Sequence, residues 1–227
     1  MITRMNISVI IPVYNASGFI KNAVKSAHHF DCVSEIILIE DGSTDSSLEV
    51  CKELVYRYDK VSLYSHPNHV NKGAGASRNL GIEKANNKWI AFLDADDIFL
   101  ENRFNKELEF YNSNIEFDGV YGALGVFYSN DEAKEEYKKQ FEKNNNLTTV
   151  SAKINASDLK YVLLGMHPNT YGYFHLDTLT VKKRLLLNIG LFNDKLRLHQ
   201  DTDLILKLSL KGLLLSGEIK HPIAKRG

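Results

Sequence analysis

The sequence has few cysteines and no long hydrophobic run. Its two cysteines, Cys32 and Cys51, lack the spacing of metal-ligand pairs, which argues against a disulfide scaffold or a zinc cluster and favours a reducing cytoplasm. The apolar run near the start of the chain, residues 7–13, is too short to span a membrane, and no signal-peptide cleavage region follows it. We therefore expect a cytoplasmic protein.

The sequence also has no excess charge of either sign. Lysine and arginine together number 28, as do aspartate and glutamate, so the chain has no overall field to attract nucleic acid or an anionic membrane. We expect no nucleic-acid partner, and any anionic ligand must be held by local groups. Neither an internal repeat nor a linker divides the 227 residues, and this length suits one domain.

What the first half does contain is a regular alternation of short apolar runs and longer segments with helical periodicity. The apolar runs are rich in β-branched and aromatic residues and cover residues 7–13, 35–40, 61–66 and 88–94. The helix-like segments between them cover residues 18–30, 45–59 and 73–86. This alternation predicts an α/β fold with a mainly parallel, Rossmann-like central sheet flanked by helices on both faces.

The second half is less regular. Residues 101–114 are predicted to form a helix, residues 117–129 a strand or hairpin, and residues 131–146 a highly charged helix. No secure element is predicted over residues 144–176. Order returns in residues 176–192 and in a helix that begins near Asp201.

Polar residues follow the predicted strands, and ligands of such sheets bind beyond the carboxyl ends of the strands. Asp41 directly follows the second strand and is placed to accept hydrogen bonds from a ligand. The residues after it have a simpler explanation, because Ser46 and Glu49 fit a capping box at the start of the next helix.

The stretch WIAFLDADDIF, residues 89–99, places three carboxylates, Asp94, Asp96 and Asp97, at the end of a buried strand. They could cap a helix that begins near Ile98 or Leu100, but one carboxylate is enough for a cap. Hard divalent cations such as Mg²⁺ and Mn²⁺ prefer oxygen ligands and often bind one or two carboxylates together with a substrate's phosphates. We interpret Asp94 and Asp96 as a site for a metal-bound diphosphate, with Asp97 in support.

Two further segments are open to more than one interpretation. Gly73 and Gly75 open a helix whose amides could face an anion, but neither of the two standard phosphate-loop patterns is present, and Arg78 is expected on a solvated helix face. Asp201 and Asp203 could cap the helix they begin. A catalytic base among them would have to face the metal site.

Five stretches in this order resemble the inverting glycosyltransferases of family 2, which have the GT-A fold and use nucleotide-diphosphate sugars. The stretches are SVIIPVYNASGFIKNAVKSA, IEDGSTDSS, GASRNLGI, WIAFLDADD and NIGLFNDKLRLHQDTDLILKLSLKG. They lie within about residues 5–125 and 180–215. One such motif is a weak signal, whereas the ordered set is specific.

The resemblance assigns residues of the first half to the nucleotide. Pro12, Tyr14 and Asn15 would border the base, and Asp41 would bind its uracil-like N–H edge. Arg78 would lie near the base or the diphosphate.

The resemblance also assigns the metal and the base. Asp94 would contact the ribose or the metal, and Asp96 would coordinate a divalent cation, Mn²⁺ or Mg²⁺, between the phosphates. Asp201 would be the general base, with Gln200 in place of the glutamate that usually precedes it. The family often continues beyond a segment like HPIAKRG to a histidine that helps bind metal or diphosphate, so we expect part of the acceptor site to lie beyond Gly227.

The activity implied is transfer of a sugar, from a UDP-sugar by preference, to a hydroxyl of a glycan or lipid-linked acceptor with inversion. Bacterial surface polysaccharide or lipooligosaccharide synthesis would bring the enzyme to the inner face of the cytoplasmic membrane as a peripheral protein. One glycosyltransferase domain would cover residues 1–227, with a nucleotide-sugar half over about residues 1–125 and an acceptor half over about residues 126–227.

Three alternative functions place different demands on the sequence. A nucleotidyltransferase would need a basic, glycine-rich loop after the first strand, where this chain has PVYNASG. A phosphatase with Asp-x-Asp nucleophiles would carry them after the first strand. A binding module that holds a sugar nucleotide without transferring it would have lost Asp96 or Asp201, and both are present.

Overall fold

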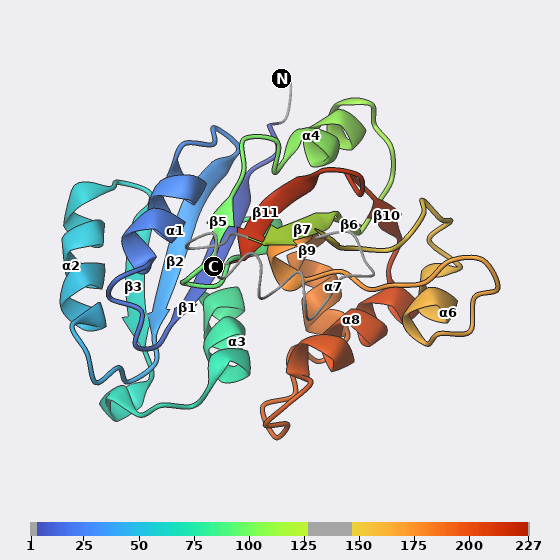
Figure 1. Ribbon diagram of the computed structural model, residues 1–227. Coiled ribbons are helices and arrows are strands. Elements are labelled where there is room, and N and C mark those ends of the chain that lie inside the picture. The colour runs from blue at the N-terminus through green and yellow to red at the C-terminus, as the bar shows by residue number, and fades with distance from the viewer. Residues whose placement is uncertain (1–3, 127–146, 227) are drawn as a thin grey trace, which may run out of the picture.

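The computed structural model describes residues 4–126 and 147–226, so the predicted charged helix over residues 131–146 lies outside the described residues. A seven-stranded sheet in the order β10-β6-β9-β4-β1-β2-β3 forms the centre (Figure 1). Its strands are β1 (Ile7–Val13), β2 (Val33–Glu40), β3 (Val61–Ser65), β4 (Trp89–Phe92), β6 (Gly119–Tyr121), β9 (Leu179–Lys182) and β10 (Leu214–Ser216). Only β9 runs antiparallel to its neighbours among the pairings of this sheet, which confirms the predicted mainly parallel arrangement.

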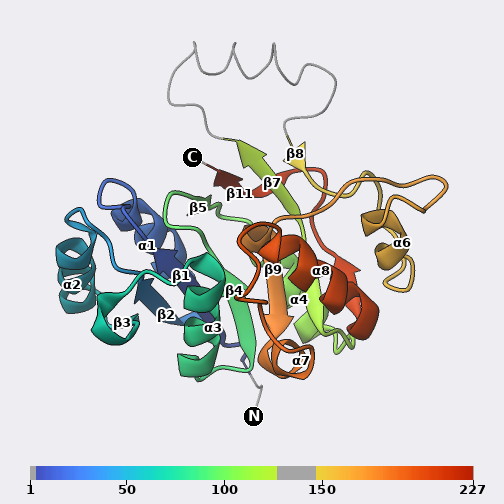
Figure 2. The same ribbon diagram turned by 90° about the horizontal axis from the view of Figure 1, so that it is seen from below.

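Helices cover both faces of this sheet, as Figure 2 shows. One face packs against α1 (Ile20–His28), α2 (Ser47–Arg57) and α4 (Asn105–Asn112); the other packs against α3 (Ala74–Lys84), α6 (Leu159–Leu163), α7 (Lys183–Asn188) and α8 (Gln200–Lys211). In β2, Ile36 and Leu38 enter one core while Ile37 and Ile39 enter the other. Strand side chains alternate between faces, so a strand covered on both sides needs a continuous apolar run. That requirement explains why β1, β2 and β4 were visible in the sequence.

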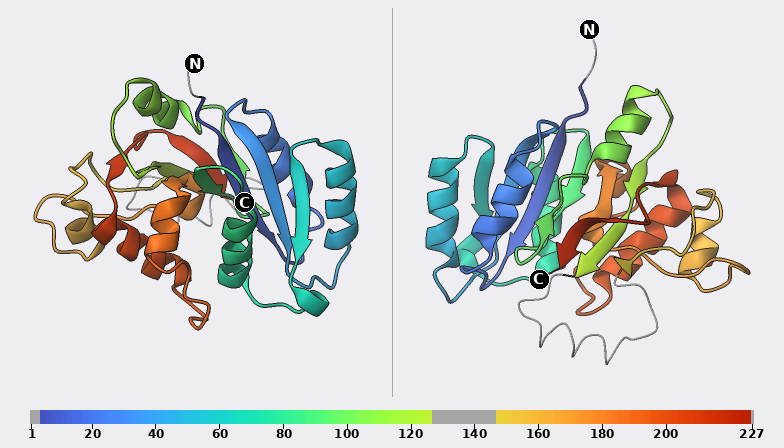
Figure 3. Two further views of the ribbon diagram at one scale, coloured as in Figure 1. Left: turned by 180° about the vertical axis from the view of Figure 1, so that it is seen from behind. Right: turned by 45° about the horizontal axis from the view of Figure 1, so that its top comes forward.

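A second, four-stranded sheet in the order β5-β11-β7-β8 lies beside the first (Figure 3). Its strands are β5 (Ile98–Phe99), β11 (Pro222–Arg226), β7 (Ala123–Val126) and β8 (Leu147–Thr148). The predicted segment over residues 117–129 is therefore divided, because β6 belongs to the central sheet and β7 to this one.

The expectation of a helix near Ile98 that the aspartates cap is wrong. The chain enters β5, where Phe99 pairs with Ala224 of β11, and α4 begins only at Asn105. The Phe99 ring is buried and contacts Phe104 at a centroid distance of 5.5 Å. The strand partner comes from the other end of the sequence, so the local pattern of residues 94–104 could not indicate it.

The remaining elements match the prediction for the second half in part. The helix predicted to begin near Asp201 is confirmed as α8. Residues 147–176 contain β8 and α6, and two short 3-10 helices, η1 (Pro67–His69) and η2 (Leu176–Thr178), occur elsewhere in the chain. In Figures 1 and 2 α2 and α6 lie at opposite ends of the molecule, and Figure 2 shows β1 and β4 between them.

Candidate functional site

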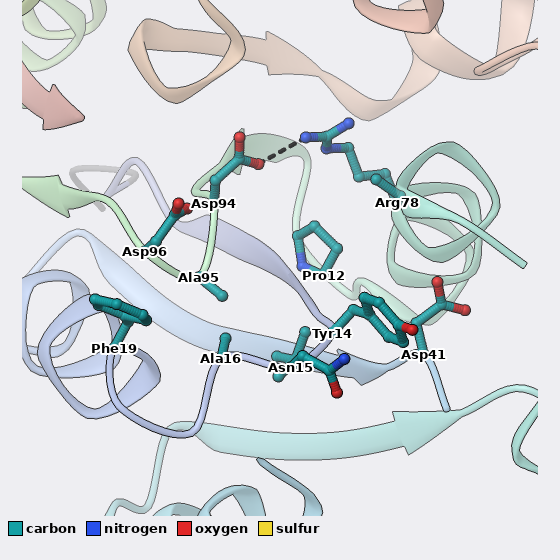
Figure 4. Close-up of a pocket in the computed structure, with 12 residues that line it drawn as sticks. Pro12, Tyr14, Asn15, Ala16, Phe19, Asp41, Arg78, Asp94, Ala95 and Asp96 are labelled. Carbon is teal, nitrogen blue, oxygen red and sulfur yellow. Dashed lines mark hydrogen bonds and ion pairs between the residues drawn. The ribbon is translucent and has the colours of Figure 1, made fainter. Parts of the chain in front are cut away.

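A pocket with a volume of about 280 Å³ opens at the carboxyl ends of β1, β2 and β4 (Figure 4). Its lining residues are Pro12, Val13, Tyr14, Asn15, Ala16, Phe19, Asp41, Ala74, Arg78, Asp94, Ala95 and Asp96. The fold therefore brings together the residues that the sequence assigned to the nucleotide and the metal. Their individual roles stay predictions.

Two exposed aromatic side chains contribute to this pocket. Tyr14 follows β1 and is 52% exposed, and Phe19 precedes α1 and is 56% exposed. Exposed rings are suited to stack against a planar or sugar ligand. Phe19 was not predicted from the sequence, because nothing in its local pattern distinguishes a pocket-lining ring from one that packs in the core.

Asn15 ties the loop after β1 to the loop after β2. Its side-chain Oδ1 accepts a hydrogen bond from the Thr44 backbone amide (2.8 Å), and the Asn15 backbone amide donates to Ser43 Oγ (3.1 Å). Asn15 has a φ of 50°, a left-handed conformation that asparagine adopts more readily than most residues. The carboxamide oxygen therefore serves this loop contact, while the residue also lines the pocket.

Asn15→Ala is expected to lower the free energy of unfolding by about 1–2 kcal/mol, because it removes a hydrogen bond and places alanine in a left-handed conformation. Urea denaturation would measure this change. Asn15→Gly tolerates the backbone angle and should cost less. An Asn15→Ala protein as stable as the parent would contradict the structural role.

The predicted capping box at α2 is wrong. Ser46 occupies the N-cap position but makes no side-chain capping bond. Asp45 caps the helix instead, with Oδ1 accepting from the Ser47 amide (2.9 Å) and Oδ2 from the Ser17 amide (3.1 Å). Hydrogen bonding from the Ser47 side chain, followed by bonds from Ser17 and from the Ser47 amide, holds the pKa of Asp45 well below its usual range. Asp45 thus reinforces the same loop contact as Asn15.

Asp41 is 2% exposed and holds the loop that leads into α3. Its Oδ1 accepts from the Lys72 amide and its Oδ2 from the Gly73 amide, both at 2.8 Å. Gly42 allows this approach, since its φ is 72° and an added Cβ would lie 2.6 Å from the His69 carbonyl oxygen. A carboxylate oxygen has a second lone pair, so these bonds leave Asp41 able to accept from a ligand as well.

The expectation that Arg78 lies on a solvated helix face is wrong. Its side chain is 5% exposed; Nη2 donates to Asp94 Oδ1 (2.6 Å) and Nη1 donates to Asp201 Oδ1 (3.0 Å). Burial alone would lower the pKa of Arg78, but the charges of Asp94 and Asp201 raise it. Two carboxylates thus compensate the cost of desolvating the guanidinium.

Asp201 reaches Arg78 because the start of α8 packs closely against α3. Gly75 makes room for Gln200, since a Cβ on Gly75 would lie 2.5 Å from Gln200 Oε1. Asp203 points elsewhere and pairs with Lys207 along the same helix at 2.6 Å. Of the two acids considered as a base, Asp201 is therefore the one that the fold links, through Arg78, to Asp94.

The three aspartates after β4 have different surroundings. Asp96 is exposed and lines the pocket, whereas Asp97 is buried. The Asp94 amide donates to Asp177 Oδ1 (3.1 Å). Ligand atoms of Asp94, Asp97, His175 and Asp177 lie within 4.8 Å of one another and form an acidic cluster, of which Asp94 also lines the pocket. His175 and Asp177 were not predicted from the sequence, because they join the aspartates only through the fold.

The charged groups of this acidic cluster shift one another's pKa values. Burial, followed by the charge of Asp177, raises the pKa of Asp94. Burial would also raise the pKa of Asp177, but hydrogen bonding from His175 lowers it to about 2. Burial opposes charge on His175, yet its bond to Asp177 raises the pKa of the imidazole.

The three carboxylates of the acidic cluster offer oxygen ligands, which fit hard divalent cations such as Mg²⁺ and Mn²⁺, and Asp96 lines the same pocket as Asp94. Asp177 is fully buried, and its Oδ2 forms an ion pair with His175 Nδ1 at 3.2 Å. Excess carboxylate charge of this kind is stabilised by a nearby cation.

No helix among the described residues is both long enough and apolar enough to cross a bilayer.

Comparison with known sequences places the chain among glycosyltransferases. A family model described as Glycosyl transferase family 2 matches residues 8–168. A protein described as an uncharacterized glycosyltransferase from Haemophilus influenzae is 38% identical over 109 residues, covering 48% of this chain and 43% of that protein. The minor teichoic acid biosynthesis protein GgaA of Bacillus subtilis is 25% identical over 217 residues, covering 90% of this chain and 43% of that protein. The chain thus spans less than half the length of these relatives.

Two solved structures share the fold. The crystal structure of S. aureus TarS 1-349 in complex with UDP-GlcNAc matches with a TM-score of 0.72 and 16% identity, covering 97% of this chain and 58% of that chain. Mannosyltransferase PcManGT from Pyrobaculum calidifontis in complex with GDP-Man and Mn²⁺ matches with a TM-score of 0.62 and 15% identity, covering 97% and 55%. At these identities the likeness shows the fold alone.

Proposed function

The chain belongs to glycosyl transferase family 2 and has the GT-A fold, and on this premise we propose that it transfers a sugar from a nucleotide-diphosphate sugar to a hydroxyl of a glycan or lipid-linked acceptor. The observation that carries the proposal is the link through Arg78 between Asp94, beside the nucleotide pocket, and Asp201, the candidate base. The whole chain would act as one domain, with the donor bound by about residues 1–125 and the acceptor by about residues 126–227.

The donor would lie in the pocket at the carboxyl ends of the strands. Pro12, Tyr14 and Asn15 would border the base, Asp41 would accept from its N–H edge, and Arg78 would lie near the diphosphate. A UDP-sugar is supported by the UDP-GlcNAc complex of TarS, and a surface polysaccharide product by the name of GgaA. Such an acceptor would bring the protein to the inner face of the cytoplasmic membrane.

Asp96 would hold a divalent cation at the open side of the pocket, with Asp94 beside it. When bound, the cation would neutralise charge on the departing diphosphate. Asp201 would remove the proton from the acceptor hydroxyl as its oxygen attacks the anomeric carbon from the face opposite the nucleotide. The configuration at that carbon would then invert, and alignment of the two reactants would supply much of the rate.

Nucleotide binding gives the first test. UDP with Mn²⁺ at about a hundred times its dissociation constant is expected to add about 2.7 kcal/mol, which raises the melting temperature by roughly 5–10 °C. GDP, dTDP and CDP should give smaller shifts, and chelator should abolish the UDP effect. Thermal denaturation with each nucleotide measures these shifts.

Asp96→Ala should abolish the metal-dependent part of the UDP shift. The matched control is Asp31→Ala, because the Asp31 side chain is 97% exposed and precedes the amino end of β2, whereas the pocket lies at the carboxyl ends of the strands. No shift with any nucleotide would contradict a donor site. A UDP shift without transfer to any glycan acceptor would instead favour a module that only binds sugar nucleotides.

A further inference from the structure

One guanidinium joins carboxylates from two segments that are far apart in the sequence. Arg78 Nη2 donates to Asp94 Oδ1 at 2.6 Å, and Nη1 donates to Asp201 Oδ1 at 3.0 Å. Asp94 follows β4 at the donor pocket, whereas Asp201 stands in the first turn of α8. In the part of the chain that the structure describes, the Asp201 carboxylate has no other hydrogen-bond or ion-pair partner. The orientation of Asp201 therefore depends on Arg78.

The other contacts around Arg78 place its helix and its side chain but form no hydrogen bond to Nη1 or Nη2. Asn79 Nδ2 donates to the Phe192 carbonyl (2.9 Å), and the Phe192 amide donates to Asn79 Oδ1 (3.0 Å), which ties the loop before α8 to α3. The Phe192 ring lies 5.5 Å from the guanidinium carbon. Arg78 Nε is buried and has no hydrogen-bond partner among the described residues. The two carboxylates are thus the polar contacts that orient the guanidinium.

An arginine can fix the relative positions of two carboxylates, which a lysine cannot. The guanidinium is planar, and its N–H groups point in fixed directions, whereas an ammonium group is a point charge on a flexible stem. Because Nη1 and Nη2 each bond a different carboxylate, the position of Asp94 constrains the position of Asp201. Only 4% of the Arg78 surface is exposed, so water does not replace these bonds readily.

We propose that Arg78 is a positioning residue, which orients the base Asp201 and ties it to the donor-site acid Asp94. This inference rests on the proposed function. It adds that Arg78 aligns the base Asp201 for the transfer step. Misplacement of a reacting group by about 1 Å can lower a rate by about 10²-fold. Loss of the fork should therefore affect turnover more than donor affinity.

The test is Arg78→Lys, which keeps the charge and removes the fork. We expect kcat for sugar transfer to fall about 10²-fold, while the donor KM and the thermal shift with UDP and Mn²⁺ stay near the parent values. Arg57→Lys is the matched control, since Arg57 lies exposed at the end of α2 and should keep the parent kcat. Steady-state kinetics with saturating acceptor separates kcat from KM.

The outcomes distinguish this inference from the proposed function. A parent protein with neither nucleotide shift nor transfer would overturn both. An active parent with unchanged kcat in Arg78→Lys, or with donor KM raised and kcat kept, would overturn the positioning role alone. If Arg78→Lys fails to fold, the double variant Arg78→Gln with Asp94→Asn leaves no uncompensated charge from this pair, and its kcat at saturating donor should show the same loss. A parent-like kcat there would equally overturn the inference.

Discussion

Asp201→Asn is expected to lower kcat for sugar transfer by about 10²–10⁴-fold, the contribution typical of a general base. Asparagine has nearly the same shape as aspartate and can still accept a hydrogen bond from Arg78, but it cannot take a proton from the acceptor hydroxyl. Donor binding should persist, because Asp201 is not among the pocket-lining residues. A radiolabel or coupled nucleotide-release assay would measure the loss, and UDP-induced thermal stabilisation would report retained binding.

The matched control is Asp203→Asn in the same turn of α8. Asp203 pairs with Lys207 rather than with Arg78, so its removal should leave kcat nearly unchanged. Equal losses in the two variants would indicate that the change acts through the helix. An Asp201→Asn enzyme with the parent kcat would exclude Asp201 as the base.

Arg103→Met is expected to lower the free energy of unfolding by about 3–5 kcal/mol, because it leaves the Glu107 charge buried without its partner. Arg103 and Glu107 are 0% and 1% exposed, and Nη1 donates to Glu107 Oε1 at 2.7 Å. Arg103 Nε also donates to the Asp177 carbonyl (2.8 Å) and Nη2 to the Leu179 carbonyl (3.0 Å). The same arginine therefore supports the segment that carries part of the acidic cluster.

Thermal denaturation should show the Arg103→Met effect as a decrease in melting temperature of roughly 6–20 °C for a domain of this size. Lys106→Met is the control, since Lys106 pairs with the half-exposed Glu109 and should cost less than about 1 kcal/mol. The double variant Arg103→Met with Glu107→Leu removes both charges and should recover much of the stability. A single variant with parent stability would show that the buried pair contributes little.

The first four strands of the central sheet and the helices between them were predictable from residues that are close in sequence. β1 and β2 are buried on both faces, so their apolar runs are continuous and end abruptly at polar residues. The same pattern marked the three aspartates that follow β4. For this reason local sequence was enough to indicate Tyr14, Asn15, Asp41, Asp94 and Asp96, all of which line the pocket.

Several features depended on contacts that a local pattern cannot encode. β5 pairs with β11 from the far end of the chain, which is why Ile98 begins a strand and not a helix. Arg78 reads as a surface residue of α3 until Asp94 and Asp201 are placed on either side of it. Likewise, His175 and Asp177 are two residues apart in the sequence, but only the fold brings them to Asp94 and Asp97.

Local sequence was sufficient to predict the mainly parallel sheet, the position of the acidic residues at strand ends, and the family. Strands buried on two faces and short polar motifs can both be recognised from residues that are close in sequence. Which carboxylates meet depended on the folded arrangement, which brought Asp201 to Arg78 and collected Asp94, Asp97, His175 and Asp177 into one cluster. Electrostatic energies depend on distances between side chains and on their burial, and both are set only when segments far apart in the sequence pack together.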